Sequence, residues 1–176
     1  HSDGSDRPKR VVERALQGET IAFLSDAGVP TISDPGYRLV NAAIDAGVRV
    51  EVVPGPTAVI TALAGSGLPT DAFYFGGFLP VKSGRKRSEL ESALDRVETS
   101  LYFESPHRIA KTLTVIEELD STRPLCVARE LTKKFETYYR GTAAEILKEL
   151  GEGRVKGEIT LVLRGRGKTK ASSGKE

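Results

Sequence analysis

The sequence is poor in the residues that support several common kinds of chemistry. Its 176 residues include one cysteine, two histidines, no methionine and no tryptophan. A lone cysteine, Cys126, excludes an internal disulfide, and two histidines exclude a histidine-rich metal site. No apolar run approaches the roughly 18 residues of a membrane-spanning helix, and the polar start is not a secretory signal. These absences favour a cytoplasmic globular protein without a metal centre.

Other signals of common enzyme classes are also missing. The sequence contains no Gly-x-Gly-x-x-Gly fingerprint, no P-loop and no Gly-x-Ser-x-Gly elbow. A net charge of +2 gives no global sign of nucleic-acid binding, so any basic surface must be local. The function must therefore be sought in loops and not in a standard nucleotide or hydrolase motif.

One loop stands out in what is present. An apolar segment at residues 20–24 leads into residues 25–36, which are crowded with Gly, Pro, Ser and Asp, and a helical pattern follows. Open α/β sheets bind their ligands in loops that follow the carboxyl ends of strands. Residues 25–36 are thus the first candidate for a ligand-binding loop.

Strand and helix patterns alternate along the chain and predict an α/β protein. The first part reads as a helix at 7–18, a strand at 20–24, a helix at 35–47, a strand at 48–53 and a helix at 57–64. This order predicts a parallel sheet with right-handed crossovers. Later strands are predicted at 73–78, 100–104, 125–129, 135–140 and 158–163, with helices after residues 82–87, at 105–119 and at 143–150.

The turn-rich segment 65–71 is the best candidate for a linker between domains. It predicts a first domain at residues 1–70, a second at 71–165 and a disordered basic tail at 166–176.

Five loops that follow strands can converge on one cleft in such an arrangement. They are residues 25–33, 54–58, 104–108, 130–133 and 156–158. Backbone amides in such loops suit a carboxylate, adenine or ribose hydroxyls. The alternative for any single loop is that Gly and Pro only make a turn.

Four segments together resemble one known family, the bacterial RsmI proteins, a branch of the tetrapyrrole methylase superfamily. The segments are Ser25-Asp26-Ala27-Gly28-Val29-Pro30-Thr31-Ile32-Ser33-Asp34-Pro35-Gly36, Val53-Pro54-Gly55-Pro56-Thr57-Ala58, Phe103-Glu104-Ser105-Pro106-His107-Arg108 and Ala128-Arg129-Glu130-Leu131-Thr132-Lys133. The resemblance covers residues 7–165. It implies methylation of a ribose 2′-oxygen of a 16S rRNA cytidine in the 30S subunit, with S-adenosylmethionine as methyl donor.

The resemblance also implies an architecture. Two small α/β domains, the first with a parallel sheet and the second with a mixed sheet, enclose the cofactor between them, usually in a homodimer. By position in the family's motifs, the expected cofactor contacts are Asp26, Ala27, Gly28, Ile32, Thr57, Ala58, Phe103, Leu131 and Glu158.

Catalysis at such a site needs alignment of the 2′-oxygen behind the methyl group, and the hydroxyl needs a base or a nearby cation. We hypothesise that Glu104 or Glu130 orients or deprotonates the hydroxyl and that Arg129 steadies the adjacent phosphate. The alternative is that Glu104 caps its helix and that Arg129 and Glu130 form a structural ion pair. His107 is expected to pack or cap, not to catalyse.

A local basic surface is predicted at residues 82–87. Lys82, Arg85, Lys86 and Arg87 fall within six residues, beside aromatic Phe75 and Phe78. In a protein that docks on ribosomal RNA, these cations are expected to contact phosphates, whereas the alternative is a merely solvated loop.

The sequence departs from the family pattern at its start. Family members begin with a strand and a Gly-Thr-Pro-Ile-Gly-Asn-like loop, which are not found here. We therefore expect a first domain short of its N-terminal strands, with weak or no cofactor binding and no activity in this fragment. Two other interpretations stay open: a tetrapyrrole methyltransferase acting on a corrin or porphyrin, and a non-catalytic interaction module.

Overall fold

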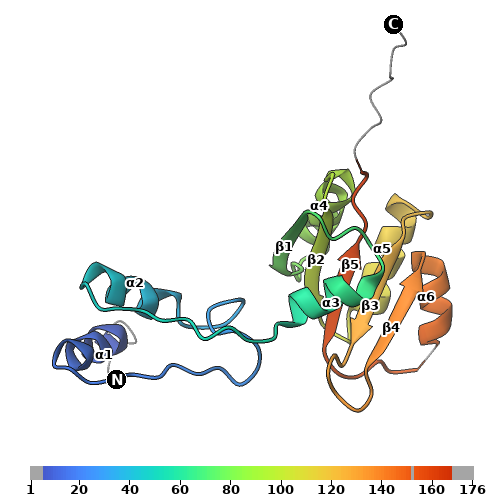
Figure 1. The fold of residues 1–176 in the computed structure, drawn as a ribbon. Helices are drawn as coiled ribbons and strands as arrows, with labels where there is room; N and C mark the ends of the chain where they lie inside the picture. The colour runs from blue at the N-terminus through green and yellow to red at the C-terminus, as the bar shows by residue number, and fades with distance from the viewer. Residues whose placement is uncertain (1–5, 152, 168–176) are drawn as a thin grey trace, which may run out of the picture. The chain divides into compact units, whose positions relative to one another are not determined.

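The computed structural model describes residues 6–151 and 153–167 (Figure 1). The helices are α1 (Asp6–Leu16), α2 (Tyr37–Asp45), α3 (Ala58–Ser66), α4 (Ser83–Asp95), α5 (Ile109–Leu119) and α6 (Ala143–Leu150). The strands are β1 (Phe73–Phe78), β2 (Thr99–Glu104), β3 (Leu125–Arg129), β4 (Thr137–Gly141) and β5 (Ile159–Leu163). None of the helices among these residues is long and apolar enough to cross a membrane.

The chain divides into two compact units, His1–Thr57 and Ala58–Glu176. In the first unit, α1 lies against α2, and each contributes a buried side chain, Val12 and Ala43. Gly47, predicted as the end of the second helix, has a φ of 74° just after α2. These two predicted helices are therefore present, with boundaries shifted by one or two residues.

The predicted parallel sheet of the first unit is not present among residues 6–57. Residues 20–24 and 48–53 are not strands, and their apolar side chains are largely exposed, as Leu24 (83%) and Val53 (85%) show. A strand exists only when a neighbour pairs with its backbone, and the described part of this unit offers none. An apolar pattern alone therefore predicted strands that lack the partners needed to form.

The boundary between the units also differs from the prediction at residue 70. Helix α3, expected to end the first domain, buries Val59, Ala62 and Leu63 against the sheet of the second unit. Its apolar side chains find their partners there, so the compact units separate between Thr57 and Ala58.

The second unit is built on a mixed sheet, as predicted. Its five strands lie in the order β1-β2-β5-β3-β4. Strands β1 and β2 are parallel, whereas β5 runs antiparallel to both of its neighbours and β4 antiparallel to β3. All five strands were predicted within one or two residues, and β1 and β3 with identical bounds.

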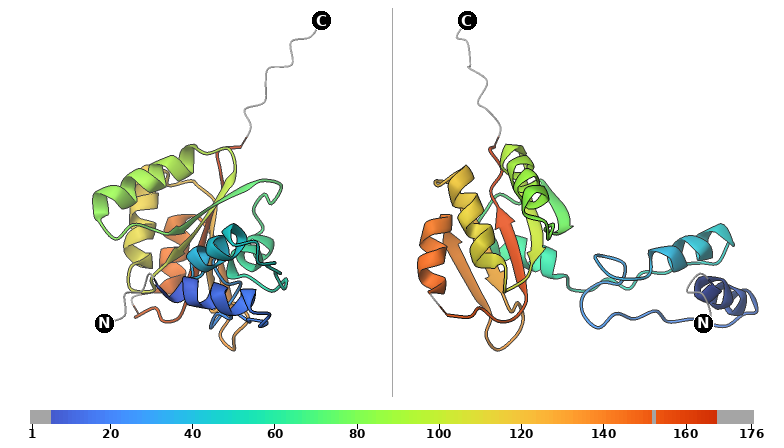
Figure 2. Two further views of the ribbon diagram at one scale, coloured as in Figure 1. Left: turned by 90° about the vertical axis from the view of Figure 1, so that its left-hand side faces the viewer. Right: turned by 180° about the vertical axis from the view of Figure 1, so that it is seen from behind.

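Helices cover both faces of this sheet. Helix α3 lies on one face, and α4, α5 and α6 lie on the other (Figure 1; Figure 2, right). The pleat sends alternate residues to the two faces. Tyr102, Val127 and Leu161 join the cluster under α4–α6, whereas Leu101 and Val162 join the cluster under α3. We call these the α4–α6 face and the α3 face.

Candidate functional site

Three predicted loops meet at one end of the sheet in the second unit. In the strand register, Ile159 at the start of β5 pairs with Glu104 at the end of β2 and with Arg129 at the end of β3. These three residues lie side by side across the sheet, so the loops 104–108, 130–133 and 156–158 all begin or end at the same end of the sheet. The structure brings together the following predicted site residues of this unit: Phe103, Glu104, Arg129, Glu130, Leu131 and Glu158.

The α3 face at this end is an aromatic and aliphatic wall. Phe103 and Leu131 are half-buried and pack against the α3-face cluster. The Phe103 ring lies 5.1 Å from the Phe75 ring and 5.3 Å from the Phe78 ring, centroid to centroid. Phe78 is 63% exposed, so the wall has an open apolar edge. Such a surface can pack against the flat or aliphatic parts of a ligand.

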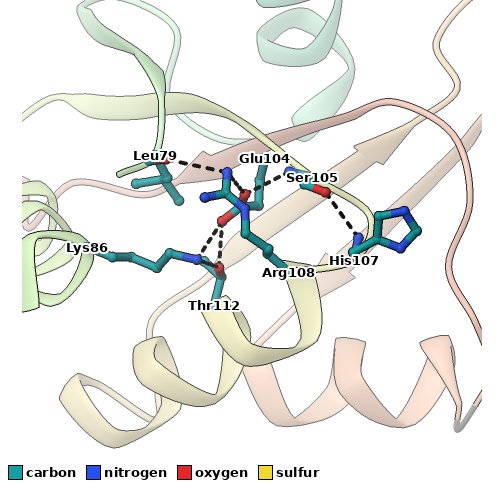
Figure 3. A network of polar contacts seen from close by, with 7 residues as sticks. All are labelled: Leu79, Lys86, Glu104, Ser105, His107, Arg108 and Thr112. Atoms are coloured by element: carbon teal, nitrogen blue, oxygen red, sulfur yellow. Dashed lines mark hydrogen bonds and ion pairs between the residues drawn. The ribbon is translucent and has the colours of Figure 1, made fainter. Parts of the chain in front are cut away.

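Glu104 points to the opposite face, into a closed polar network (Figure 3). Its Oε2 accepts hydrogen bonds from Lys86 Nζ (2.9 Å) and Thr112 Oγ1 (2.7 Å). Its Oε1 accepts from the Ser105 backbone N–H (2.7 Å) and pairs with Arg108. The carboxylate is fully buried, and two contacts at each oxygen fill its acceptor positions. This geometry favours the structural alternative for Glu104 over a role as catalytic base.

The predicted basic loop is part of a helix. Lys82 is the N-cap of α4, and Lys86 N–H bonds to Lys82 O at 2.9 Å, so Arg85, Lys86 and Arg87 lie in the first turns. Lys86 is buried as the partner of Glu104 and does not face solvent, which corrects its assignment to an RNA-binding loop. Arg87 pairs with Glu91 and Glu118. Lys82 and Arg85 are exposed.

Arg129 also lies on the α4–α6 side. It alternates along β3 with Leu125 and Val127, which face that cluster. Its Nε donates to the Lys156 carbonyl at 2.7 Å, and its side chain lines a shallow pocket with Tyr139, Leu150 and Arg154. Arg129 therefore lies on the opposite side of the sheet from Phe103 and Leu131, and its proposed contact with the phosphate next to the reacting hydroxyl stays a prediction.

Glu130 organises the turn after β3. Its Oε1 accepts from the Glu158 backbone N–H (2.9 Å) and from Lys133 Nζ (3.0 Å). Lys133 Nζ also donates to Glu158 Oε2 at 2.9 Å, and Glu130 N–H returns a bond to Glu158 O at 3.0 Å. The bond from the Glu158 backbone, followed by that from Lys133, lowers the pKa of Glu130. A lowered pKa makes a weaker general base and favours a positioning role.

The same turn has an unusual backbone. Glu130 and Thr132 have φ values of 53° and 63°, in the left-handed region that non-glycine residues rarely adopt. Thr132 N–H is tied to Glu136 Oε2 at 2.6 Å. Two left-handed residues on either side of Leu131 aim its side chain at the α3-face cluster. Backbone strain of this kind concentrates at functional sites.

The first unit carries the loop at residues 25–36, with four expected cofactor contacts: Asp26, Ala27, Gly28 and Ile32. Ser25 Oγ donates to the carbonyls of Ala27 (3.3 Å) and Gly28 (3.1 Å). Gly28 has a φ of 71°, a conformation that glycine adopts without strain. The remaining two expected contacts flank the unit boundary, since Thr57 ends the first unit and Ala58 begins α3.

Sequence reasoning did not assign a role to Arg108 or Lys133. Each lies close to an acidic residue in the chain, since Arg108 follows Glu104 by four residues and Lys133 follows Glu130 by three. This spacing was a usable signal of ion pairing. His107, predicted to pack or cap, is exposed in the turn before α5, and its backbone N–H bonds to Ser105 Oγ at 3.3 Å.

Comparison with known proteins gives the fold and the family. The model of the family "Tetrapyrrole (Corrin/Porphyrin) Methylases" matches residues 2–147. A solved uroporphyrin-III C-methyltransferase from Thermus thermophilus, complexed with S-adenosyl homocysteine, superposes with a TM-score of 0.55 at 21% identity. The superposition covers 87% of this chain and 70% of that one. The fold is thus the α/β fold of these methylases.

Curated relatives are more similar in sequence. Ribosomal RNA small subunit methyltransferase I of Halalkalibacterium halodurans is 43% identical over 90% of this chain and 55% of its own length. The protein of the same name from Hydrogenobaculum is 45% identical over 88% of this chain and 67% of its own length. The chain spans about half the length of the first of these relatives. By family model and by these relatives, the chain belongs to the tetrapyrrole methylase family, in its ribosomal RNA small subunit methyltransferase I branch.

Proposed function

We propose that the protein transfers a methyl group from S-adenosylmethionine to the ribose 2′-oxygen of a cytidine in 16S rRNA. The observation that carries the proposal is the sequence identity of 43–45% to relatives named ribosomal RNA small subunit methyltransferase I. The Thermus thermophilus methylase of the same fold holds S-adenosyl homocysteine, the product of such a donor. That neighbour shares only 21% identity, so its tetrapyrrole substrate is not carried over to this chain.

The cofactor site is proposed to use the α3 face of the sheet end. Phe103 and Leu131 form an apolar wall there that suits the adenine or the methionine side chain. From their positions in the family's motifs, we propose as further cofactor contacts Asp26, Ala27, Gly28, Ile32, Thr57, Ala58 and Glu158.

The reaction is an in-line displacement. The ribose 2′-oxygen bonds to the methyl carbon while the carbon–sulfur bond breaks, and the hydroxyl proton is lost to a base or to solvent. The products are S-adenosyl homocysteine and a 2′-O-methylated ribose. Because the sulfonium already activates the methyl carbon, alignment is the main task of the protein. We assign Glu130 and Lys133 to positioning of the turn that carries Leu131, and Glu104 to support of the strand end.

RNA contact is proposed for the exposed cations at the start of α4. Lys82 and Arg85 are accessible for phosphate oxygens, whereas Lys86 is not. We further propose that the RNA is recognised within the 30S subunit and that the protein works as a homodimer.

Transfer of labelled methyl groups tests this function. The protein at the length of its curated relatives should transfer tritium from methyl-labelled cofactor to 30S subunits that lack the modification. The labelled nucleotide should be a cytidine whose 3′-phosphodiester resists alkali, because a 2′-O-methyl group blocks hydrolysis. Labelling of a corrin or porphyrin in place of RNA would contradict the proposal. No labelling of any acceptor, with intact cofactor binding, would also count against it.

A further inference from the structure

The buried network around Glu104 holds more positive than negative charge. It contains one carboxylate and two cations, Lys86 and Arg108 (Figure 3). Within the described residues, neither cation is paired with a second carboxylate. The Lys86 side chain is 9% exposed and the Glu104 side chain 0%. Excess charge in so closed a place is costly unless an anion completes it.

Arg108 is the open member of this network. Its side chain is 23% exposed, and its Nη2 pairs with Glu104 and donates to the Leu79 carbonyl at 3.4 Å. Its Nη1 is enclosed and has no hydrogen-bond acceptor in the part of the chain that the structure describes. An enclosed donor without an acceptor is rare in native proteins, so this guanidinium has hydrogen-bonding capacity that the fold leaves unused. A planar guanidinium with spare donors suits the paired oxygens of a phosphate.

The position of Arg108 fits RNA better than the methyl donor. Its contact with Leu79 places it beside the segment that leads to Lys82, the exposed N-cap of α4. Its partner Glu104 lies on the α4–α6 face, opposite to the proposed cofactor wall at Phe103. An anion that binds here therefore approaches from the side of α4 and α5.

We propose that Arg108 binds a phosphodiester group of the RNA substrate and that Glu104 and Lys86 hold its guanidinium in place. This proposal rests on the proposed function and adds to it a phosphate contact that the sequence did not single out. Glu104 and Lys86 are positioning residues in this scheme, because Glu104 fixes Arg108 and Lys86 balances the rest of the carboxylate charge.

The substitution Arg108→Gln tests the proposal. Glutamine keeps a side-chain N–H for Glu104 but removes the positive charge. In the protein at the length of its relatives, binding to 30S subunits is measured over a range of salt concentrations. Arg108→Gln should weaken binding about ten-fold and reduce the slope of log affinity against log salt by roughly 0.7–0.9, the loss of one phosphate contact. Affinity for S-adenosylmethionine should stay within about two-fold.

Arg123→Gln is the matched control. Arg123 is also partly buried (15%) and ion-paired, with Asp120, but it precedes β3 at the other end of the sheet. Its substitution should leave RNA affinity and salt slope unchanged. The proposal is overturned if Arg108→Gln leaves the slope unchanged, or if it weakens the methyl donor and not the RNA. It is equally overturned if both variants lose RNA binding and stability alike, since Arg108 is then only a structural ion pair.

The two proposals can fail separately. Absence of methyl transfer by the unsubstituted protein removes the proposed function, while the RNA-binding comparison of Arg108→Gln with Arg123→Gln stays readable.

Discussion

Phe103 and Glu104 are neighbours in β2, yet their side chains lie on opposite faces of the sheet. Phe103 packs on the α3 face with Phe75 and Phe78, whereas Glu104 is enclosed beneath α4 and α5 by Lys86 and Thr112. The motif that joins them in sequence therefore serves two purposes. One residue is available for a ligand, and the next secures the strand end on which that ligand wall is built.

Glu104 should be a major contributor to stability. Glu104→Gln keeps the shape of the side chain but leaves Lys86 buried without a carboxylate. We expect the free energy of unfolding to fall by about 3–5 kcal/mol. Urea unfolding of the variant measures this. Adding Lys86→Met should recover part of the loss, because the unpaired ammonium is then gone.

An exposed acidic residue on α4, the helix that carries Lys86, gives the control. Glu91 pairs with Arg87, and its side chain is 50% exposed. Glu91→Gln should change the free energy of unfolding by no more than about 0.5 kcal/mol. If both substitutions changed the free energy of unfolding equally, the buried network around Glu104 would contribute no more to stability than an exposed ion pair.

Thr132 is expected to lower the stability of the protein, because its backbone is strained in the turn that carries Leu131. Its φ of 63° is unfavourable for a β-branched residue and costs nothing for glycine. Thr132→Gly should therefore stabilise the protein by up to about 1 kcal/mol. The same change at exposed Thr114 in α5 should instead destabilise by about 0.3–0.5 kcal/mol. Loss of stability at Thr132 would show that its backbone is not strained.

The Glu130 carboxylate predicts a defined pH dependence. Its pKa is lowered in the fold by the Glu158 backbone N–H and by Lys133, so the unfolded chain binds its proton more tightly. Its stabilising effect is complete above the ordinary glutamate pKa of about 4.3 and is lost as the pH falls through the lowered value. Glu130→Gln should reduce stability at pH 7 and make the acid decline between about pH 5 and pH 3 shallower.

Lys133→Met should also make the acid decline in stability shallower, but less so, because it removes only the second of the two contacts that lower the pKa of Glu130. Urea unfolding across that pH range compares the three proteins. Identical acid declines in wild type and Glu130→Gln would contradict the assigned contacts.

Cys126 should be inert in the folded protein. It is completely buried in β3, and burial raises its pKa to about 11. At pH 8 only about one thiol in a thousand is then ionised, and alkylating reagents react with the thiolate. Iodoacetamide should label Cys126 slowly in buffer and rapidly in concentrated urea, as mass spectrometry can follow. Fast labelling in buffer would place the thiol at the surface.

Local signals in the sequence predicted the second unit well. The bounds of α6 follow from the capping box of Thr142 and Glu145, and those of β1 from an aromatic run that ends in glycines and Phe78. By contrast, α5 begins at Ile109 and not at residue 105. Both Arg108 N–H and Ile109 N–H bond to Ser105 O, which makes a separate turn before the helix.

Features that depend on residues far away in the sequence could not be predicted. Residues 20–24 and 48–53 have the pattern of strands, but a strand needs a paired neighbour that the pattern does not supply. The roles of Glu104 and Arg129 depended on which face of the sheet each side chain takes. Adjacent residues of a strand point to opposite faces of the sheet, which the sequence alone can tell. Which of the two faces is covered depends on the packing of α4–α6.

Calorimetric binding of S-adenosylmethionine to three variants tests the division of the sheet end most directly. The measurement uses the protein at the length of its curated relatives. Phe103→Ala and Leu131→Ala, on the α3 face, should each weaken binding about ten-fold or more, whereas Arg129→Gln, on the opposite side, should change it less than about two-fold. Weakening by Arg129→Gln alone, with Phe103→Ala and Leu131→Ala unaffected, would place the cofactor on the wrong face and contradict the proposed site.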